Sequence, residues 1–218
     1  MPCTLGAFGS GNRRSVALLF AVHGKDHSAY VADITMTVSL RKGCLLVAAA
    51  TMMDDNFQQT VVLLCDHRED GSHGLVLNRP VEASPQAAEQ LPYLDGRLYY
   101  GGPVQPQALQ VLHPYGQRIP GAVEVLPGVF SGGDFDAMEG AFSNHLLDPA
   151  SCLFFAGYSG WSEGQLEEEI ESGAWLIVPG TRELVFDVDR EALWTETVRL
   201  HGRDDPMFSY FPEDPRWN

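Results

Sequence analysis

The sequence predicts one compact α+β domain, because strand-like and helix-like apolar patterns alternate along most of the chain without an obvious linker. Three unbroken apolar runs of strand length occupy residues 44–50, 61–65 and 74–78. Two later segments, residues 134–146 and 162–173, place apolar side chains at helical spacing instead. A chain of 218 residues, 44% of them hydrophobic, can bury a sizeable core without disulfides or a metal.

Turn-forming residues separate the strands of the first half. Residues 54–56 (Asp-Asp-Asn) lie between the first two runs, and residues 70–72 (Asp-Gly-Ser) lie between the second and third. The second turn predicts a β-hairpin. Ser84-Pro85 predicts the start of a short helix that ends near Leu91. Further short strands are expected at residues 98–100, 108–113, 123–126 and 129–130.

Asp134 is placed to cap a helix, since its carboxylate can accept a hydrogen bond from a free amide of the first turn. Spacings of three, four and four bring a set of apolar side chains to one face of this helix: Phe135, Met138, Phe142 and Leu146. We expect this face to be buried.

A second helix is predicted after Ser162. Ser162 and Gln165 have the spacing of a capping box, and Leu166 and Ile170 share one face. Gly173 supplies a left-handed stop. The remaining expected elements are a buried strand over residues 152–156, a strand over residues 175–178 and a last helix over residues 190–201.

The two ends of the chain are set apart from the domain. Residues 1–35 are rich in small residues and carry Arg13-Arg14 before a short apolar run. Three interpretations stay open for this N-terminal extension: a start codon placed too far upstream of Met36, a disordered or loosely packed tail, or an export signal. We assign residues 36–202 to the domain and the proline- and aromatic-rich residues 203–218 to a C-terminal tail.

The charge balance bears directly on function. The chain has 14 Lys and Arg residues against 29 Asp and Glu residues, a formal net charge of −15. Nucleic-acid binding draws most of its affinity from cations that neutralise phosphates, and no run of the sequence gathers the few cations into a patch. The sequence therefore argues against a nucleic-acid partner. It predicts an acidic surface that is either simply solvated or able to bind a basic protein partner.

Cysteine usage predicts a reducing compartment. The four cysteines form no C-x-x-C pair, and Cys44, Cys65 and Cys152 lie inside apolar runs, where a free thiol behaves as a small buried hydrophobe. No stretch approaches the roughly 18 apolar residues that a membrane span requires. We therefore expect a cytoplasmic protein without a membrane partner.

Five sequence blocks occur in the chain in a fixed order. They are GCLLVAAATMMDDNFQQTVVLLCDH, HGLVLNRP, YYGGPVQPQALQVLH, FFAGYSGWSEGQLEEEIESGAWL and ELVFD, the last followed by a Trp-bearing helix that ends at Gly202. In this order the blocks resemble the AlgH/YqgE family of bacterial proteins, and GYSGW-x-x-GQLE-x-E is the most specific part. The departures are small: Ala50-Thr51 stands where proline is usual, and Gln58-Gln59 where arginines are common.

The resemblance implies an α+β fold in which a mixed or antiparallel β-sheet is curled into a pseudo-barrel with flanking helices. It implies no established activity. Some family members carry the label of transcriptional regulator, from an association with alginate production. The sequence gives that label no physical support, since it contains no helix-turn-helix pattern and no basic recognition helix.

Two glycine-rich segments are the candidates for a ligand-binding site. Gly101-Gly102-Pro103 can let a ligand approach the backbone closely, or it can simply turn the chain. Gly157-Tyr158-Ser159-Gly160-Trp161 is predicted to turn between a strand and a helix, where the helix start near Gln165 offers backbone N–H groups to an anion. The acidic residues of that helix argue against a strongly charged anion. As a hydrolase motif the segment fails at Trp161, which is too large for the tight turn.

No residue set forces a reaction. Asp66-His67 and His73 flank the expected hairpin, where they are either turn residues or acid/base groups. A third metal ligand at a diagnostic spacing is missing from the sequence, as are the glycine motifs of nucleotide-binding proteins. We assign no catalytic residue, no metal ligand and no cofactor.

Three hypotheses follow. The leading one is a non-enzymatic cytoplasmic protein that acts through protein partners, in a regulatory or interaction role. The second is a small-ligand binder, which requires the two glycine-rich segments to converge on one pocket. The third is a hydrolase centred on Ser159 or His67, which requires a base within about 3 Å of the nucleophile.

Overall fold

The computed structural model describes residues 16–17, 35–36, 39–84, 91–94 and 98–202. It divides into two compact units, residues 1–39 and residues 40–218. In the first unit, β1 (Val16–Ala17) pairs antiparallel with β2 (Thr35–Met36). The helix expected over residues 84–91 and the C-terminal tail fall largely or wholly outside the described residues. The assignment of residues 1–35 to an extension stays a prediction.

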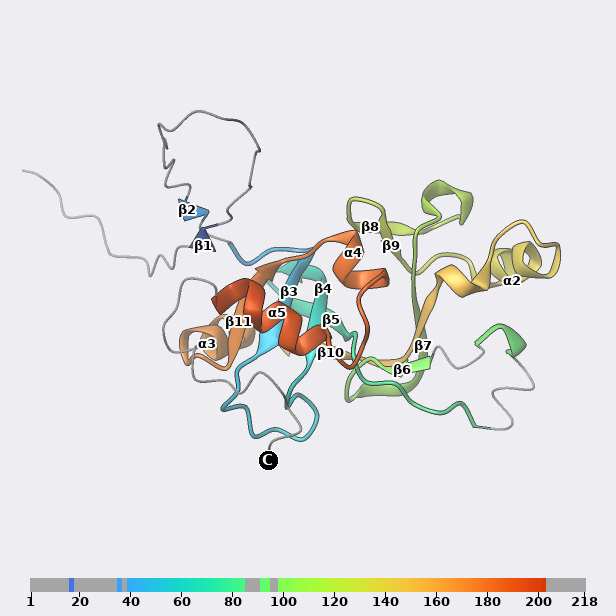
Figure 1. Cartoon of the computed structure of the whole chain (residues 1–218). Coiled ribbons are helices and arrows are strands. Elements are labelled where there is room, and N and C mark those ends of the chain that lie inside the picture. The colour runs from blue at the N-terminus through green and yellow to red at the C-terminus, as the bar shows by residue number, and fades with distance from the viewer. Residues whose placement is uncertain (1–15, 18–34, 37–38, 85–90, 95–97, 203–218) are drawn as a thin grey trace, which may run out of the picture. The chain divides into compact units, whose positions relative to one another are not determined.

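The second unit is built on one sheet of nine strands (Figure 1). Its strand order is β11-β3-β4-β5-β10-β7-β9-β8, and β6 pairs with β10 outside this path. Only the β6–β10 pairing is parallel, so the mixed, largely antiparallel sheet expected from the family resemblance is confirmed. The strands are β3 (Cys44–Ala48), β4 (Val61–Arg68), β5 (Gly71–Val76), β6 (Leu98–Tyr100), β7 (Val104–His113), β8 (Val123–Leu126), β9 (Val129–Ser131), β10 (Leu153–Ser162) and β11 (Trp175–Pro179).

Four described α-helices accompany the sheet: α2 (Phe135–Ser143), α3 (Gln165–Glu171), α4 (Arg182–Phe186) and α5 (Leu193–Gly202). Three single turns of 3-10 helix also occur: η1 (Pro92–Leu94), η2 (Gly116–Arg118) and η3 (Pro149–Ser151). Asp134 caps α2 as predicted, since its carboxylate accepts a hydrogen bond from the Ala137 N–H at 3.0 Å. The predicted left-handed stop after α3 is also confirmed, because Gly173 has a φ of +81°.

The first strands of the sheet, β3 and most of β4, are buried on both faces, which explains why they are apolar without alternation. Successive side chains of a strand point to opposite faces. In β3, Leu45 and Val47 therefore join one apolar cluster with α4 and α5, while Leu46 and Ala48 join another cluster with α3. A third cluster packs α2 against the outer side of β7 and β10.

The sheet curls back on itself. Leu45 of β3 shares a cluster with Val125 of β8 and Val129 of β9, although β3 and β8 lie near opposite ends of the strand order. The Lys42 ammonium donates a hydrogen bond to the Glu124 carbonyl oxygen at 2.8 Å, beside the same contact. The pseudo-barrel predicted by the resemblance is therefore confirmed, as a curled half-barrel that encloses the largest cluster.

The two halves of the sheet are joined where the chain after β6 runs against β10. The Gly101 N–H donates to the Ala156 carbonyl at 2.9 Å, and the Gly101 carbonyl accepts from the Val76 N–H at 3.0 Å. The contact leaves no room for side chains. A Cβ at Gly101 would lie 2.2 Å from the Gly157 carbonyl oxygen, and one at Gly157 would lie 2.6 Å from the Gly102 oxygen. We call this contact the glycine crossing.

The structure corrects two expectations. Residues 157–161 do not turn between a strand and a helix, because β10 continues to Ser162 and pairs with β5 over Ser159–Ser162. The register of the β10–β7 pairing shifts between Ala156 and Tyr158, and Gly157, with a φ of +70°, forms a β-bulge there. Leu146 is not on the buried face of α2. The helix ends at Ser143, which leaves Leu146 65% exposed and buries Leu147 in its place.

Replacement of Gly101 by alanine tests the glycine crossing. The added methyl group meets backbone that cannot move without breaking strand pairing, so we expect the Gly101→Ala protein to lose about 3 kcal/mol or more of unfolding free energy. Gly140 offers a matched control, since it lies on the exposed face of α2 and a Cβ added there would have nothing within 4 Å. Gly140→Ala should stabilise by about 0.5–1 kcal/mol. Urea denaturation followed by circular dichroism measures both, and equal stability of the two variants would contradict the crossing.

Candidate functional site

Two tryptophans of the fourth sequence block, Trp161 and Trp175, share one carboxylate. The indole N–H groups of Trp161 on β10 and Trp175 on β11 donate to the same Oε2 atom of Glu169 on α3, at 2.9 and 2.7 Å. The two rings meet edge to face at 6.0 Å between centroids, and Phe57 packs against both. Both indoles are buried and hydrogen-bonded, so this Glu169 clamp fixes α3 across one face of the sheet.

Gln165 completes the clamp. Its amide N–H donates to Glu169 Oε1 at 2.9 Å, and its own oxygen accepts from the N–H and the hydroxyl of Ser162, each at 3.1 Å. The expected capping box is thus half formed, because α3 begins only at Gln165, after Gly164 in a left-handed conformation. Both functional groups of the Gln165 side chain are engaged within the protein. The residue therefore acts in the clamp, and its role as a ligand-binding residue stays a prediction.

The two glycine-rich segments do converge, as the small-ligand hypothesis required, but on each other. Gly101, Gly102 and Gly157 meet backbone to backbone in the glycine crossing, and Pro103 beside them is exposed. Ser159 is fully buried, and its hydroxyl donates to the Gly101 carbonyl oxygen at 3.1 Å. The space between the segments is filled by their own backbones.

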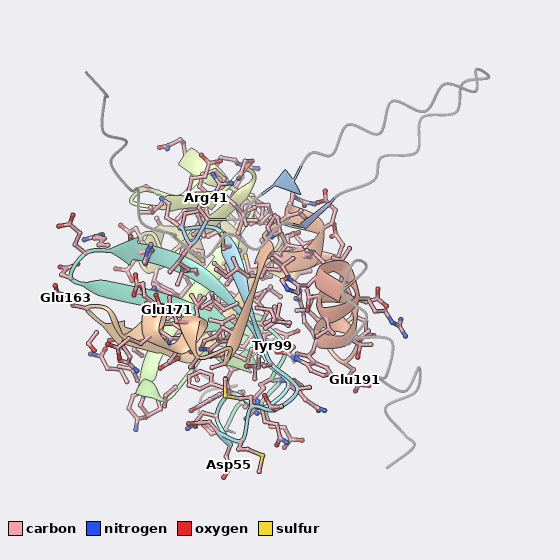
Figure 2. The ribbon with its side chains drawn as sticks, turned by 90° about the vertical axis from the view of Figure 1, so that its left-hand side faces the viewer. Arg41, Asp55, Tyr99, Glu163, Glu171 and Glu191 are labelled. Carbon is pink, nitrogen blue, oxygen red and sulfur yellow. The ribbon has the colours of Figure 1, made fainter. Side chains whose placement is uncertain are left out.

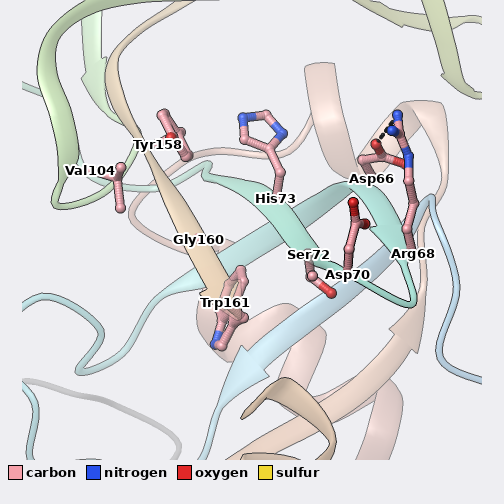
Figure 3. Close-up of a pocket in the computed structure, with 10 residues that line it drawn as sticks. Asp66, Arg68, Asp70, Ser72, His73, Val104, Tyr158, Gly160 and Trp161 are labelled. Atoms are coloured by element: carbon pink, nitrogen blue, oxygen red, sulfur yellow. Dashed lines mark ion pairs between the residues drawn. The ribbon is translucent and has the colours of Figure 1, made fainter. Parts of the chain in front are cut away.

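An open groove of about 410 Å³ lies next to the crossing (Figure 3). Three of the predicted ligand residues line it, namely Tyr158, Gly160 and Trp161 of β10. Its other side comes from the β4–β5 hairpin and the start of β7: Asp66, Arg68, Asp70, Gly71, Ser72, His73 and Val104. Ligand binding at the three β10 residues remains a prediction.

Charge and aromatic contacts shape the groove wall. The His73 and Tyr158 rings lie 4.8 Å apart between centroids, on the same side of the sheet as Asp66 in Figure 3. Burial lowers the pKa of His73, and the carboxylate of Asp66 partly opposes that effect. The Arg68 guanidinium lies 2.5 Å from the Asp66 carboxylate. Asp70, at the tip of the hairpin, belongs to no described ion pair.

Sequence reasoning missed part of the groove for a physical reason. His73 and Asp66 were noticed as residues flanking a turn, but Val104 and Arg68 gave no signal of their own. His73 and Val104 lie beside Tyr158 because β5 and β7 pair with opposite edges of β10, and Asp66 and Arg68 follow on β4, which pairs with β5. Pairing between strands that lie far apart in sequence leaves no local pattern from which the groove could have been predicted.

The hairpin and α3 together present what we call the acidic surface, residues 66–70 and 163–171. These two segments contain eight carboxylates, and Arg68 is their only Lys or Arg. His67 joins them, since its Nε2 lies 3.6 Å from a carboxylate oxygen of Glu167. Figure 2 shows Glu163 and Glu171 on the same side of the domain. The exposed acids of this surface are Glu69, Asp70, Glu163, Glu167, Glu168 and Glu171.

A second hollow, of about 570 Å³, lies between β6 and the loop before α5. The Arg190 guanidinium lies over the Tyr99 ring, 5.8 Å from its centroid, and donates to the Val185 carbonyl oxygen. Burial lowers the pKa of Arg190. Asp187, Asp189 and Glu191 also line the hollow. The two contacts of Arg190 hold the loop against β6, and we assign this hollow a structural role.

Ser159 and His67, the two candidate residues of the hydrolase hypothesis, have different surroundings. Ser159 donates to a backbone carbonyl, so its described partner is not a base. His67 does have a nucleophile within reach, because its Nδ1 lies 2.8 Å from the Ser72 hydroxyl. Ser72 is buried at 9% exposure. Its side chain projects from the face of the sheet opposite His73, and its low exposure restricts the approach of a substrate.

The fold and the groove define the class of protein to which the chain belongs: a single-domain α+β half-barrel with a strand-lined groove and an acidic face. The sequence model of the AlgH-like family matches residues 45–205. The chain belongs to the AlgH-like family. In the part of the chain that the structure describes, no helix is both long enough and apolar enough to cross a membrane.

Relatives of similar length share most of the chain. A UPF0301 protein of Chlorobium limicola is 40% identical over 180 residues, covering 82% of this chain and 96% of that protein. A UPF0301 protein of Chlorobaculum tepidum is 41% identical with the same coverage. The solution structure of the AlgH protein from Pseudomonas aeruginosa matches with a TM-score of 0.60 at 32% identity, over 79% of this chain and 95% of that one.

A crystal structure of a more distant protein is similar to this chain in fold. Protein DIP2367 from Corynebacterium diphtheriae matches with a TM-score of 0.65 at 24% identity, over 80% of this chain and 94% of that chain. The half-barrel is therefore shared at low sequence identity.

Removal of the shared carboxylate tests the Glu169 clamp. Glu169→Ala leaves two buried indole N–H groups without their acceptor, so we expect a loss of about 2–4 kcal/mol of unfolding free energy. Glu168→Ala, one residue away on the exposed face of α3, should change the unfolding free energy by less than about 0.5 kcal/mol. Chemical denaturation followed by tryptophan fluorescence distinguishes them. A Glu169→Ala protein as stable as the Glu168→Ala protein would show that the clamp is dispensable.

Proposed function

We propose that the chain is a non-enzymatic cytoplasmic binding protein, with a regulatory or interaction role, whose acidic surface recognises a cationic segment of a protein partner. The observation that carries the proposal is the charge of residues 66–70 and 163–171, with eight carboxylates against one arginine. Opposite charge on a partner steers its approach and excludes partners of like charge. The same argument disfavours nucleic-acid partners, so regulation in this proposal acts through protein contact.

Part of the charge on this surface is not needed for the fold. Glu169 serves the clamp, and Asp66 pairs with Arg68. Glu163, Glu168 and Glu171 are exposed and enter no described ion pair. Glu171 lies in the last turn of α3, where the helix dipole disfavours a negative charge, and it is three residues from the like charge of Glu168. The exposed carboxylates of the acidic surface are therefore explained better by attraction of a cationic partner than by a contribution to the stability of the fold.

The cysteines support the cytoplasmic part of the proposal. Cys44, Cys65 and Cys152 are buried, and none of the three takes part in a disulfide. Burial raises the pKa of the Cys65 thiol to about 12, so this thiol stays protonated and unreactive. Buried cysteines outside disulfides suit a reducing compartment.

Removal of four charges from the acidic surface tests the proposal. The variant carries Glu→Gln changes at 163, 167, 168 and 171, and the probe is a fluorescent lysine-rich peptide. We expect the quadruple variant to bind the peptide about tenfold more weakly at low salt, because each exposed carboxylate contributes a few tenths of a kcal/mol. Fluorescence anisotropy at two salt concentrations makes the measurement, and raised salt should weaken binding to the unaltered protein.

A second quadruple variant controls for total charge. Asp55, Asp136, Glu139 and Glu191 are exposed and lie outside the acidic surface. Their conversion to Asn or Gln removes the same number of negative charges as the first quadruple variant. Equal weakening by both quadruple variants, or no peptide binding by the unaltered protein, would refute a local recognition surface.

Hydrolysis is the second candidate function, favoured only by the 2.8 Å contact between His67 Nδ1 and the Ser72 hydroxyl, with Glu167 beyond it. A fluorophosphonate probe reacts with a serine that a base activates. Intact-mass measurement should show no adduct if the binding proposal is right. An adduct that disappears in both the Ser72→Ala and the His67→Ala proteins would move the function to the hydrolase class.

A further inference from the structure

One edge of β10 is only partly used. β5 pairs with Ser159–Ser162 on one edge, and β7 pairs with the opposite edge only as far as Tyr158, which faces Val104. Beyond Tyr158, no described strand pairs with the β7-side edge. Gly160 and Ser162, on this stretch, are both exposed.

Two independent observations show which backbone groups face the open edge. In an antiparallel pair, the N–H and C=O of one residue point to the same edge, and successive residues alternate. The Ser162 N–H donates to the Gln165 side chain, so it points away from β5. The two-residue turn between Arg68 and Gly71 directs the backbone of Gly71 toward β4, and Gly71 is the residue opposite Ser162. Both observations place the N–H and C=O of Gly160, two residues before Ser162, on the open edge.

The missing side chain of Gly160 keeps this edge accessible. A Cβ at Gly160 would lie 3.4 Å from the Tyr158 ring and 3.6 Å from a methyl group of Val104, which are ordinary contact distances. A side chain would therefore fit there and would fill the groove beside Tyr158. Unlike Gly101 and Gly157, Gly160 is not required by backbone packing, so its effect is to leave the groove open.

The surroundings of the edge fit an extended cationic chain. Asp70 faces the groove from the hairpin, Glu163 follows Ser162 directly, and Arg68 is neutralised by Asp66. Tyr158 and Val104 offer apolar surface on the other side. A second copy of this chain fits poorly at this edge, since each copy carries a net charge of −15.

We propose that a short extended segment of a cationic partner adds as a β-strand to the open edge of β10 at Gly160. This inference rests on the proposed function and specifies its mode: the backbone hydrogen bonds of the added strand hold it, and the acidic surface selects its charge.

The test uses blocked peptides of alternating lysine and threonine, compared with versions N-methylated at the lysines or at the threonines. N-methylation removes strand hydrogen-bond donors and leaves the charge unchanged. We expect the unmodified peptide to bind the full chain, and at least one methylated version to bind about tenfold more weakly, because backbone hydrogen bonds are lost. Binding is measured by fluorescence anisotropy in low salt.

A groove-filling variant gives a second readout. The Gly160→Leu protein should bind the unmodified peptide about tenfold more weakly. The Gly140→Ala protein, altered on α2, should bind it like the unaltered protein. Circular dichroism and thermal unfolding establish that both variants are folded before binding is measured.

The outcomes separate the two proposals. Equal binding of all peptides, with no effect of Gly160→Leu, overturns strand addition and leaves recognition by charge standing. Absence of binding by every cationic peptide overturns both proposals. Concentration-dependent dimers in analytical ultracentrifugation that Gly160→Leu abolishes would assign the edge to a second copy and overturn the cationic occupant.

Discussion

The glycine crossing is the contact on which the rest of the domain depends. Gly101 and Gly102 lie against the backbone of residues 157–159 with no space for a Cβ, where β5, β6 and β10 meet. This close approach joins the two halves of the sheet and lets the sheet curl until β3 and β8 share one core. It also ends the pairing of β7 with β10 at Tyr158, which leaves the groove and the open edge beside it.

The Glu169 clamp builds on that frame. One carboxylate holds Trp161, Trp175 and Gln165, and thereby fixes α3 across the sheet at the end of β10. The most specific part of the sequence, residues 157–169, is therefore explained largely by folding, since the side chains of Trp161, Gln165 and Glu169 form hydrogen bonds within the protein. What the fold leaves unused is the outer face of α3, the tip of the hairpin and the backbone of Gly160. Function is inferred from these groups.

Local patterns in the sequence predicted the local structure well. The cap at Asp134, the hairpin near Asp70 and the stop at Gly173 depend on residues a few positions apart, and all are confirmed. The segment from Gly157 to Trp161 was predicted wrongly, because glycines and serine favour a turn locally. Its strand conformation comes from β5 and β7, whose residues lie roughly 50 to 90 positions away. The groove could not be predicted from the sequence either, because the strands that line it are far apart in sequence.

Hydrogen–deuterium exchange with and without a lysine-rich peptide tests most directly whether the hairpin, α3 and the edge of β10 form the functional face. Exchange reports where backbone amides become protected on binding. We expect slower exchange in residues 66–73 and 159–171, with no change in residues 54–59 and 187–191, which are also acidic. Protection confined to residues 54–59 or 187–191, or spread evenly over all acidic segments, would contradict it.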